Sequence, residues 1–159
     1  SPQLYFYVLL KRAFEESGIY NLSLVDYIVF LLTCHITSQG NEEGSRFLYV
    51  SDYLNKIDIA SNRDQFYLRV QLANEILILT GVFQEYMKHR TQRKAAPNIP
   101  FYEVVGCTQY EAAMHHPLAA ELNLKNVFSE LSTSFDNVRQ TLNQFSERFI
   151  SLGEPFREL

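Results

Sequence analysis

Apolar side chains recur along most of this chain at the three- and four-residue spacing of an α-helix. Between Leu4 and Ser17 they follow this period, and Gly18 stands where such a helix would end. A second helix is predicted from Ser23, its expected N-cap, to about Thr37. Because apolar residues occupy nearly every face of this second segment, we expect it to be surrounded by the rest of the protein.

The middle of the chain alternates between helical periodicity and polar breaks. Helices are predicted over residues 51–57, from Arg63 to about Gly81, over 82–92 and over 101–115. The polar stretches 38–45 and 91–100 are predicted to be loops. Pro117 disfavours helical geometry at His116, so the helix over 101–115 is expected to end there.

The longest regular pattern lies in the C-terminal third of the chain. Apolar residues follow one another there in alternating steps of four and three: Leu124, Phe128, Leu131, Phe135, Val138, Leu142, Phe145, Phe149 and Leu152. Neither Gly nor Pro interrupts the chain between Leu118 and Leu152. The pattern predicts one helix of ~35 residues, roughly 50 Å long. The sequence therefore indicates an all-α fold, a bundle of about six or seven helices with one long C-terminal helix, in a single domain spanning residues 1–159.

A helix of that length would be longer than a compact domain of this size is wide. We therefore expect Phe145, Phe149 and Leu152 to remain uncovered and to form an interface, either in a homodimer or with a protein partner. A helix packed inside its own domain shows the same spacing, so internal core is the alternative for these residues.

Composition limits the classes of partner. Hydrophobic residues make up 47% of the chain and charged residues 20%, which is an ordinary globular balance. The net charge of −4 does not favour nucleic acid or an anionic membrane. The longest apolar run, Leu24 to Ile36, is shorter than the ~20 residues that span a bilayer. Because no charged-then-apolar leader follows Ser1, a cytoplasmic location with reduced cysteines is expected.

Four histidines raise the possibility of a metal site. Glu85 and His89 are four residues apart, as are Glu111 and His115, whereas helical di-metal sites use Glu and His three apart. We expect these pairs to be surface neighbours, and we expect no metal and no cofactor. Cys34 and His35 are adjacent, so they would lie on different faces of a helix and could not act as a catalytic pair. His35 itself is expected to be a core histidine.

One basic cluster is present, composed of Lys88, Arg90, Arg93 and Lys94. Cations are favoured at the C-terminal end of a helix, so a solvated helix end explains the cluster. The alternative is a contact with an anion or with an acidic partner.

Several short segments resemble a group of uncharacterised bacterial helical proteins with no known activity. They are the run Leu79-Thr-Gly-Val-Phe83, then Phe101-Tyr102, Val105-Gly106, Tyr110, Ala112-Ala113 and the stretch 131–135. The resemblance implies a bacterial origin and an all-helical fold. From the residues we expect a non-catalytic protein that acts through protein–protein interaction or self-association. The alternative is a small-molecule-binding or catalytic bundle with a pocket lined by aromatic and His side chains.

Overall fold

The computed structural model describes residues 2–38, 49–94 and 97–151, and within them the side chains of residues 4–35, 49–92 and 97–148. Helices account for 87% of the described residues and no strand occurs among them, so the prediction of an all-α fold is confirmed. The described part contains nine helices, more than the six or seven expected. They are α1 Pro2–Glu16, α2 Leu22–Ser38, α3 Val50–Ile59, α4 Asn62–Gly81, α5 Gln84–Lys94, α6 Ile99–His115, α7 Pro117–Glu121, α8 Lys125–Thr133 and α9 Phe135–Ser151.

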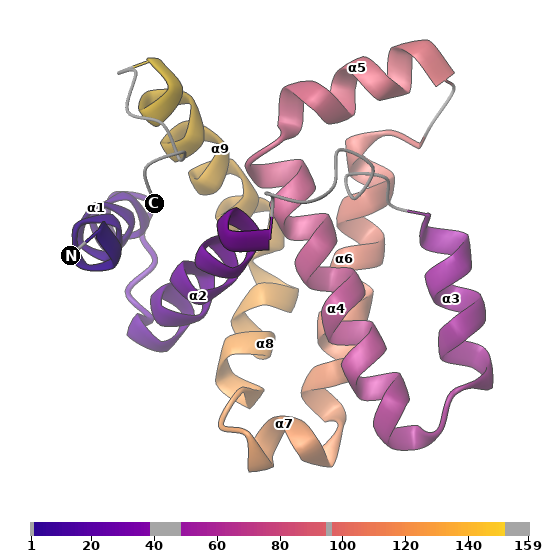
Figure 1. Ribbon diagram of the computed structural model, residues 1–159. Coiled ribbons are helices and arrows are strands. Elements are labelled where there is room, and N and C mark those ends of the chain that lie inside the picture. The colour runs from indigo at the N-terminus through magenta and orange to yellow at the C-terminus, as the bar shows by residue number, and fades with distance from the viewer. Residues whose placement is uncertain (1, 39–48, 95–96, 152–159) are drawn as a thin grey trace.

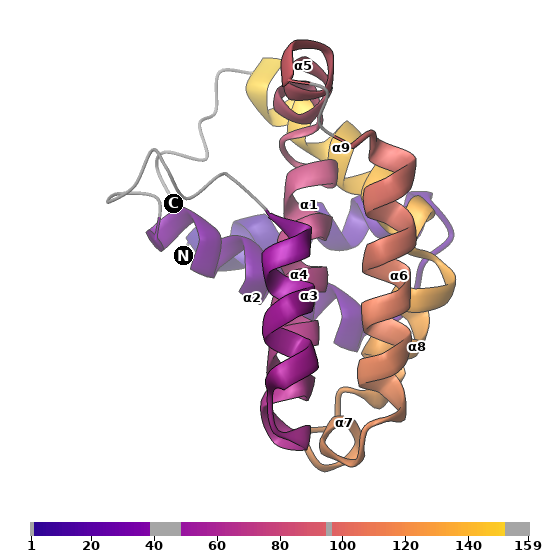
Figure 2. The same cartoon turned by 90° about the vertical axis from the view of Figure 1, so that its right-hand side faces the viewer.

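The centre of the fold is the antiparallel pair α4 and α6, with α8 packed on α6 and α9 on α4 (Figure 1). Four hydrophobic residues of α4 are fully buried, namely Leu72, Ala73, Ile76 and Leu77. Helix α3 packs on the opposite side of α4, and α5 crosses the top of the bundle (Figure 2). No single helix in the described ranges is long and apolar enough to cross a bilayer. Helices α4 and α5 reach the length and apolar composition of a span only as a pair, and the pair is bent by 89°.

Helices α1 and α2 form a hairpin beside this centre. Gly18 ends α1 with a φ of 82°, a left-handed conformation that glycine adopts without steric cost. The N-cap of α2 is Asn21, whose side-chain oxygen accepts a hydrogen bond from the Leu24 amide at 3.2 Å, so the assignment of this role to Ser23 was wrong. The expectation that α2 is surrounded was also wrong, because Leu22 and Phe30 on its outer side are more than half exposed.

Several other helix boundaries agree with the local chemistry of the sequence. Ser61 caps α4 by accepting from the Asp64 amide, and Asn98 caps α6 by accepting from the Phe101 amide. Helix α6 ends at His115, and His116 has the extended backbone that Pro117 imposes on its predecessor. The predicted loop over residues 38–45 lies outside the described residues, apart from Ser38 at the end of α2.

The single long C-terminal helix was not found, because the segment divides into α7, α8 and α9. Asn123 makes the first break: its φ is 57°, and the amide of Leu124 donates back to the carbonyl of Ala119 in a C-terminal capping turn. The second break is at Ser134. The hydroxyls of Ser132 and Thr133 both hydrogen-bond to helix carbonyls beside it, and bonds of this kind bend helices.

The apolar seam, which begins just after the first break, nevertheless continues across the second. Six of its side chains lie in the core of the same chain: Phe128, Leu131, Phe135, Val138, Leu142 and Phe145. The internal-core interpretation of these positions is therefore the correct one. Two glycines allow the close approach of the helices that carry the seam. A Cβ atom on Gly81 would lie 3.0 Å from the Cβ of Leu142, and one on Gly106 would lie 2.8 Å from the ring of Phe135.

Candidate functional site

Of the residues predicted to form an interface, the structure describes the side chain of Phe145 alone, on the inner side of α9. The Phe145 side chain is only 5% exposed, and its ring packs edge-on against Phe6 of α1 with centroids 5.3 Å apart. Phe145 is thus a core residue, and its assignment to an interface was wrong because the broken helices fold back on the bundle. The side chain of Phe149 and the whole of Leu152 lie outside the described residues.

The predicted basic cluster lies on α5. Lys88 forms a solvent-exposed ion pair with Glu85 at 3.8 Å, and the guanidinium of Arg90 lies 5.7 Å from the centre of the Tyr49 ring. The side chains of Arg93 and Lys94 lie outside the described set. Contact of this cluster with an anion or acidic partner remains a prediction.

The histidines and cysteines have distinct surroundings. His35 is half-buried, with its ring 5.3 Å from that of Phe83. His116 caps α7: its Nδ1 accepts from the Leu118 amide, and its Nε2 faces the side-chain oxygen of Asn62. This geometry fits the tautomer protonated at Nε2. No disulfide joins Cys34 and Cys107, and no group of three or more His, Cys, Asp or Glu within the described ranges could hold a metal ion.

A buried polar triad links three helices. The hydroxyls of Tyr27 in α2 and Tyr110 in α6 both donate to the side-chain oxygen of Asn74 in α4, each at 2.8 Å. Burial raises the pKa of both tyrosines, so both remain neutral donors. The ring of Phe128 packs against both of them. The triad satisfies polar atoms inside the core and orients α2 on the central pair.

A charged cluster connects α6 with α9. Arg139 is only 8% exposed and donates to Glu103 and to Asp136, the second at 2.9 Å. Burial and the neighbouring Asp136 carboxylate raise the pKa of Glu103, although Arg139 opposes the shift. Burial also favours a higher pKa for Asp136. Hydrogen bonds from Arg139, Glu103 and Gln140 outweigh that effect, so the pKa of Asp136 is lowered. The half-buried Cys107 lies near these carboxylates, and burial together with their charge raises the pKa of its thiol, which keeps the thiol protonated and unreactive.

The outer face of α2 is the main surface feature that sequence reasoning missed. Its inner side chains, Leu24, Val25, Ile28 and Leu32, are buried. On the opposite side Phe30 is 63% exposed and Leu22 is 52% exposed. Helix α2 is the most apolar of the long helices, and α6 is the next. One side of α2 is nonetheless exposed to solvent. The sequence indicated only that all sides of α2 are apolar, and the tertiary fold determined which side stayed open.

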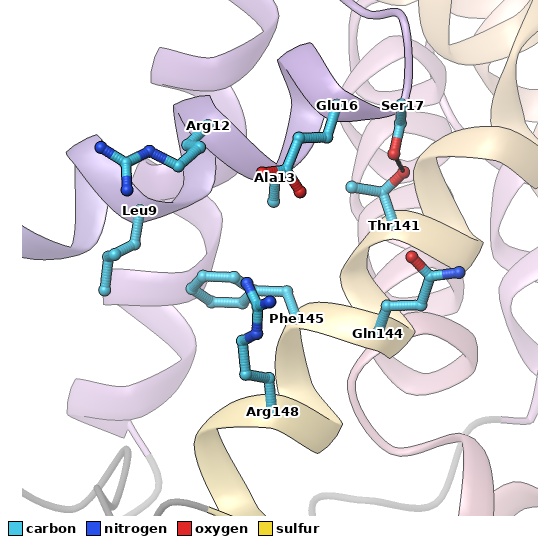
Figure 3. Close-up of a pocket in the computed structure, with 9 residues that line it drawn as sticks. All are labelled: Leu9, Arg12, Ala13, Glu16, Ser17, Thr141, Gln144, Phe145 and Arg148. Atoms are coloured by element: carbon cyan, nitrogen blue, oxygen red, sulfur yellow. Dashed lines mark hydrogen bonds between the residues drawn. The ribbon is translucent and has the colours of Figure 1, made fainter.

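A groove about 420 Å³ in volume separates α1 from α9 (Figure 3). Nine residues line it: Leu9, Arg12, Ala13, Glu16, Ser17, Thr141, Gln144, Phe145 and Arg148. The lining contains neither Tyr nor His, so it differs from the pocket that the sequence suggested as an alternative. No local signal could have identified it, because its two walls come from opposite ends of the chain.

Comparison with protein-family models, with curated proteins and with solved structures gives no match.

Proposed function

We propose that this chain is a helical interaction domain that self-associates, and that two copies meet through the outer face of α2. The observation that supports this most is the exposure of Phe30 at 63% on the most apolar of the long helices. Burying a phenylalanine gains about 1.5–3 kcal/mol relative to leaving it in water. An apolar helix with one open face is typical of a helix that is covered in an assembly.

The layout of this face suits a second copy of the same chain. Helix α2 runs from Leu22 to Ser38, and Phe30 stands midway between them. Asp26 and Cys34 are both exposed, one turn before and one turn after Phe30. If two α2 helices cross antiparallel with Phe30 at the two-fold axis, Phe30 meets its own copy and Asp26 faces the partner's Cys34. Such a contact is isologous, which is the commonest kind in symmetric dimers.

Charge is compatible with this arrangement. Asp26 is the one charged side chain in the described part of α2. In the antiparallel crossing, the Asp26 carboxylates of the two copies are separated by about 12 Å along the helix axis. This separation exceeds the screening length of about 8 Å at physiological ionic strength, so their repulsion is weak.

Sedimentation of three forms of the protein tests the assignment. The wild type is expected to be dimeric at tens of micromolar. Phe30→Glu is expected to be a monomer with wild-type helicity, because the new charge is solvated in the monomer and buried without a partner in the dimer. Ile59→Glu is the matched control, since Ile59 is 89% exposed on α3 and this variant is expected to remain dimeric.

A further variant separates interface from core. Phe145→Glu is expected to unfold the protein, because Phe145 is buried against Phe6 in the same chain. A wild-type protein that sediments as a monomer at several hundred micromolar would contradict the proposed function, as would a Phe30→Glu variant that dimerises like the wild type.

The alternative function, a small-molecule-binding helical bundle, is favoured by a different observation, the groove between α1 and α9.

A further inference from the structure

The groove between α1 and α9 combines an apolar floor with charged walls. Leu9 and Ala13 come from α1 and Phe145 from α9, and together they form the apolar part of the lining. The Thr141 hydroxyl donates to Ser17 Oγ at 2.8 Å, and the Asn137 amide group donates to the Ser17 carbonyl at 3.2 Å. These two hydrogen bonds tie the end of α1 to α9, so they fix the groove's width at that end.

The ionised side chains of the groove come from both helices. Figure 3 shows Glu16 and Arg148 extending from α1 and α9 toward the middle of the groove, while Arg12 lies at its edge with its guanidinium turned outward. Arg12 is exposed, and an exposed side chain changes rotamer within nanoseconds, so this guanidinium can swing across the groove. Two arginines and one glutamate give the lining a formal charge of +1.

We infer that this groove binds a small organic monocarboxylate that carries an apolar chain. A guanidinium matches a carboxylate in shape, donates two parallel hydrogen bonds to it and keeps its charge at every physiological pH. The apolar chain of the ligand lies along Leu9, Ala13 and Phe145. The charge of +1 suits a monoanion, because Glu16 repels a second negative charge. The volume of about 420 Å³ lies within the usual range of small-molecule sites.

Octanoate is the probe, and its binding is measured by calorimetry and by amide shifts in the NMR spectrum. We expect the amides of Ala13, Thr141 and Gln144 to shift in a saturable way. Octanol lacks the charge and acetate lacks the chain, so both are expected to bind at least about tenfold more weakly, since a charge-assisted hydrogen bond and a buried alkyl chain each contribute that factor.

Three variants test the roles of the lining residues. Arg12→Gln is expected to weaken octanoate binding about tenfold, because the variant keeps the length of the side chain but loses the charge. Ala13→Leu fills the apolar floor and is expected to abolish binding, whereas Ala120→Leu, at an exposed position on α7, is the control and is expected to bind like the wild type. Glu16→Gln is expected to bind more tightly.

Three results would each overturn the inference: no saturable shift at millimolar octanoate, equal binding of octanol, or unchanged affinity in both Arg12→Gln and Ala13→Leu. Each variant is checked for wild-type helicity by circular dichroism. Because the groove does not include the exposed face of α2, the outcome is independent of whether the chain dimerises.

Discussion

Gly106 is the position where the packing of the central helices can be tested most sharply. The Ala variant would place a methyl group 2.8 Å from two ring carbons of Phe135 and 3.3 Å from Ile76 Cγ2. Carbon atoms pack best at about 3.5–4.0 Å, so the methyl group overlaps the ring. Phe135 is 1% exposed and Ile76 is fully buried, which leaves the ring no free space into which to move.

Two opposing effects determine how much Gly106→Ala changes the free energy of unfolding. Overpacking a tight core costs about 1–3 kcal/mol, and a 2.8 Å contact with a buried ring belongs in the upper part of that range, about 2–3 kcal/mol. Replacing a mid-helix Gly with Ala gains about 1 kcal/mol through helix propensity. We therefore expect Gly106→Ala to lower the free energy of unfolding by about 1–2 kcal/mol, and in a domain of this size that lowers the thermal midpoint by about 2–8 °C.

The loss of stability is measured by thermal and urea unfolding, monitored by circular dichroism at 222 nm. Phe135→Leu supplies the control, because it removes the ring that the methyl group meets. In that background Gly106→Ala should cost nothing or should stabilise by up to about 1 kcal/mol, so the two substitutions should couple by about 1–3 kcal/mol in a double-mutant cycle. The reasoning is refuted if Gly106→Ala is as stable as the wild type, or if its cost is the same with and without the Phe135 ring.

Two further predictions concern ionisable groups. Burial raises the pKa of Glu75, which accepts a hydrogen bond from the Tyr53 hydroxyl, while Lys56 lowers it. A raised folded-state pKa means that Glu75 supports the fold most below its unfolded pKa of about 4.3, and that this support is lost as pH rises through the folded value. As pH rises above about 4.3, the wild type loses this support and Glu75→Gln does not. The thermal midpoint of Glu75→Gln should therefore rise relative to that of the wild type, and a difference that stays constant with pH would contradict this. Arg139→Met should reduce the free energy of unfolding by about 2–3 kcal/mol, because it leaves the Glu103 and Asp136 carboxylates facing each other, and urea unfolding that shows no loss would contradict that role.

The helical class of the fold could be predicted because apolar periodicity and proline positions act locally. Pro117 predicted the end of α6 correctly, since its ring restricts the residue before it. Six of the nine positions in the heptad seam, from Phe128 to Phe145, are buried in the described part of the chain. It could not reveal the breaks between α7, α8 and α9, because Asn123 and the hydroxyls near Ser134 act through backbone hydrogen bonds that an apolar pattern does not register.

The outer face of α2 and the groove between α1 and α9 could not be predicted from the sequence, for a different reason. An evenly apolar helix such as α2 gives no periodic signal to distinguish its covered side from its open side. Arg12 and Arg148 are separated by almost the whole chain, and only the packing of α1 on α9 brings them to one groove. Phe145 was assigned to an interface because a straight helix would have carried it beyond the bundle.

Cross-linking at the predicted two-fold axis tests the central claim most directly. A disulfide requires Cα atoms about 4.4–6.8 Å apart, so it forms between identical positions only beside the axis. In a Cys34→Ser background, Phe30→Cys should give a covalent dimer under mild oxidation, whereas Ile59→Cys, at the more exposed position on α3, should remain monomeric on a non-reducing gel. Failure of Phe30→Cys to cross-link, or equally fast cross-linking of Ile59→Cys, would contradict a dimer formed through α2.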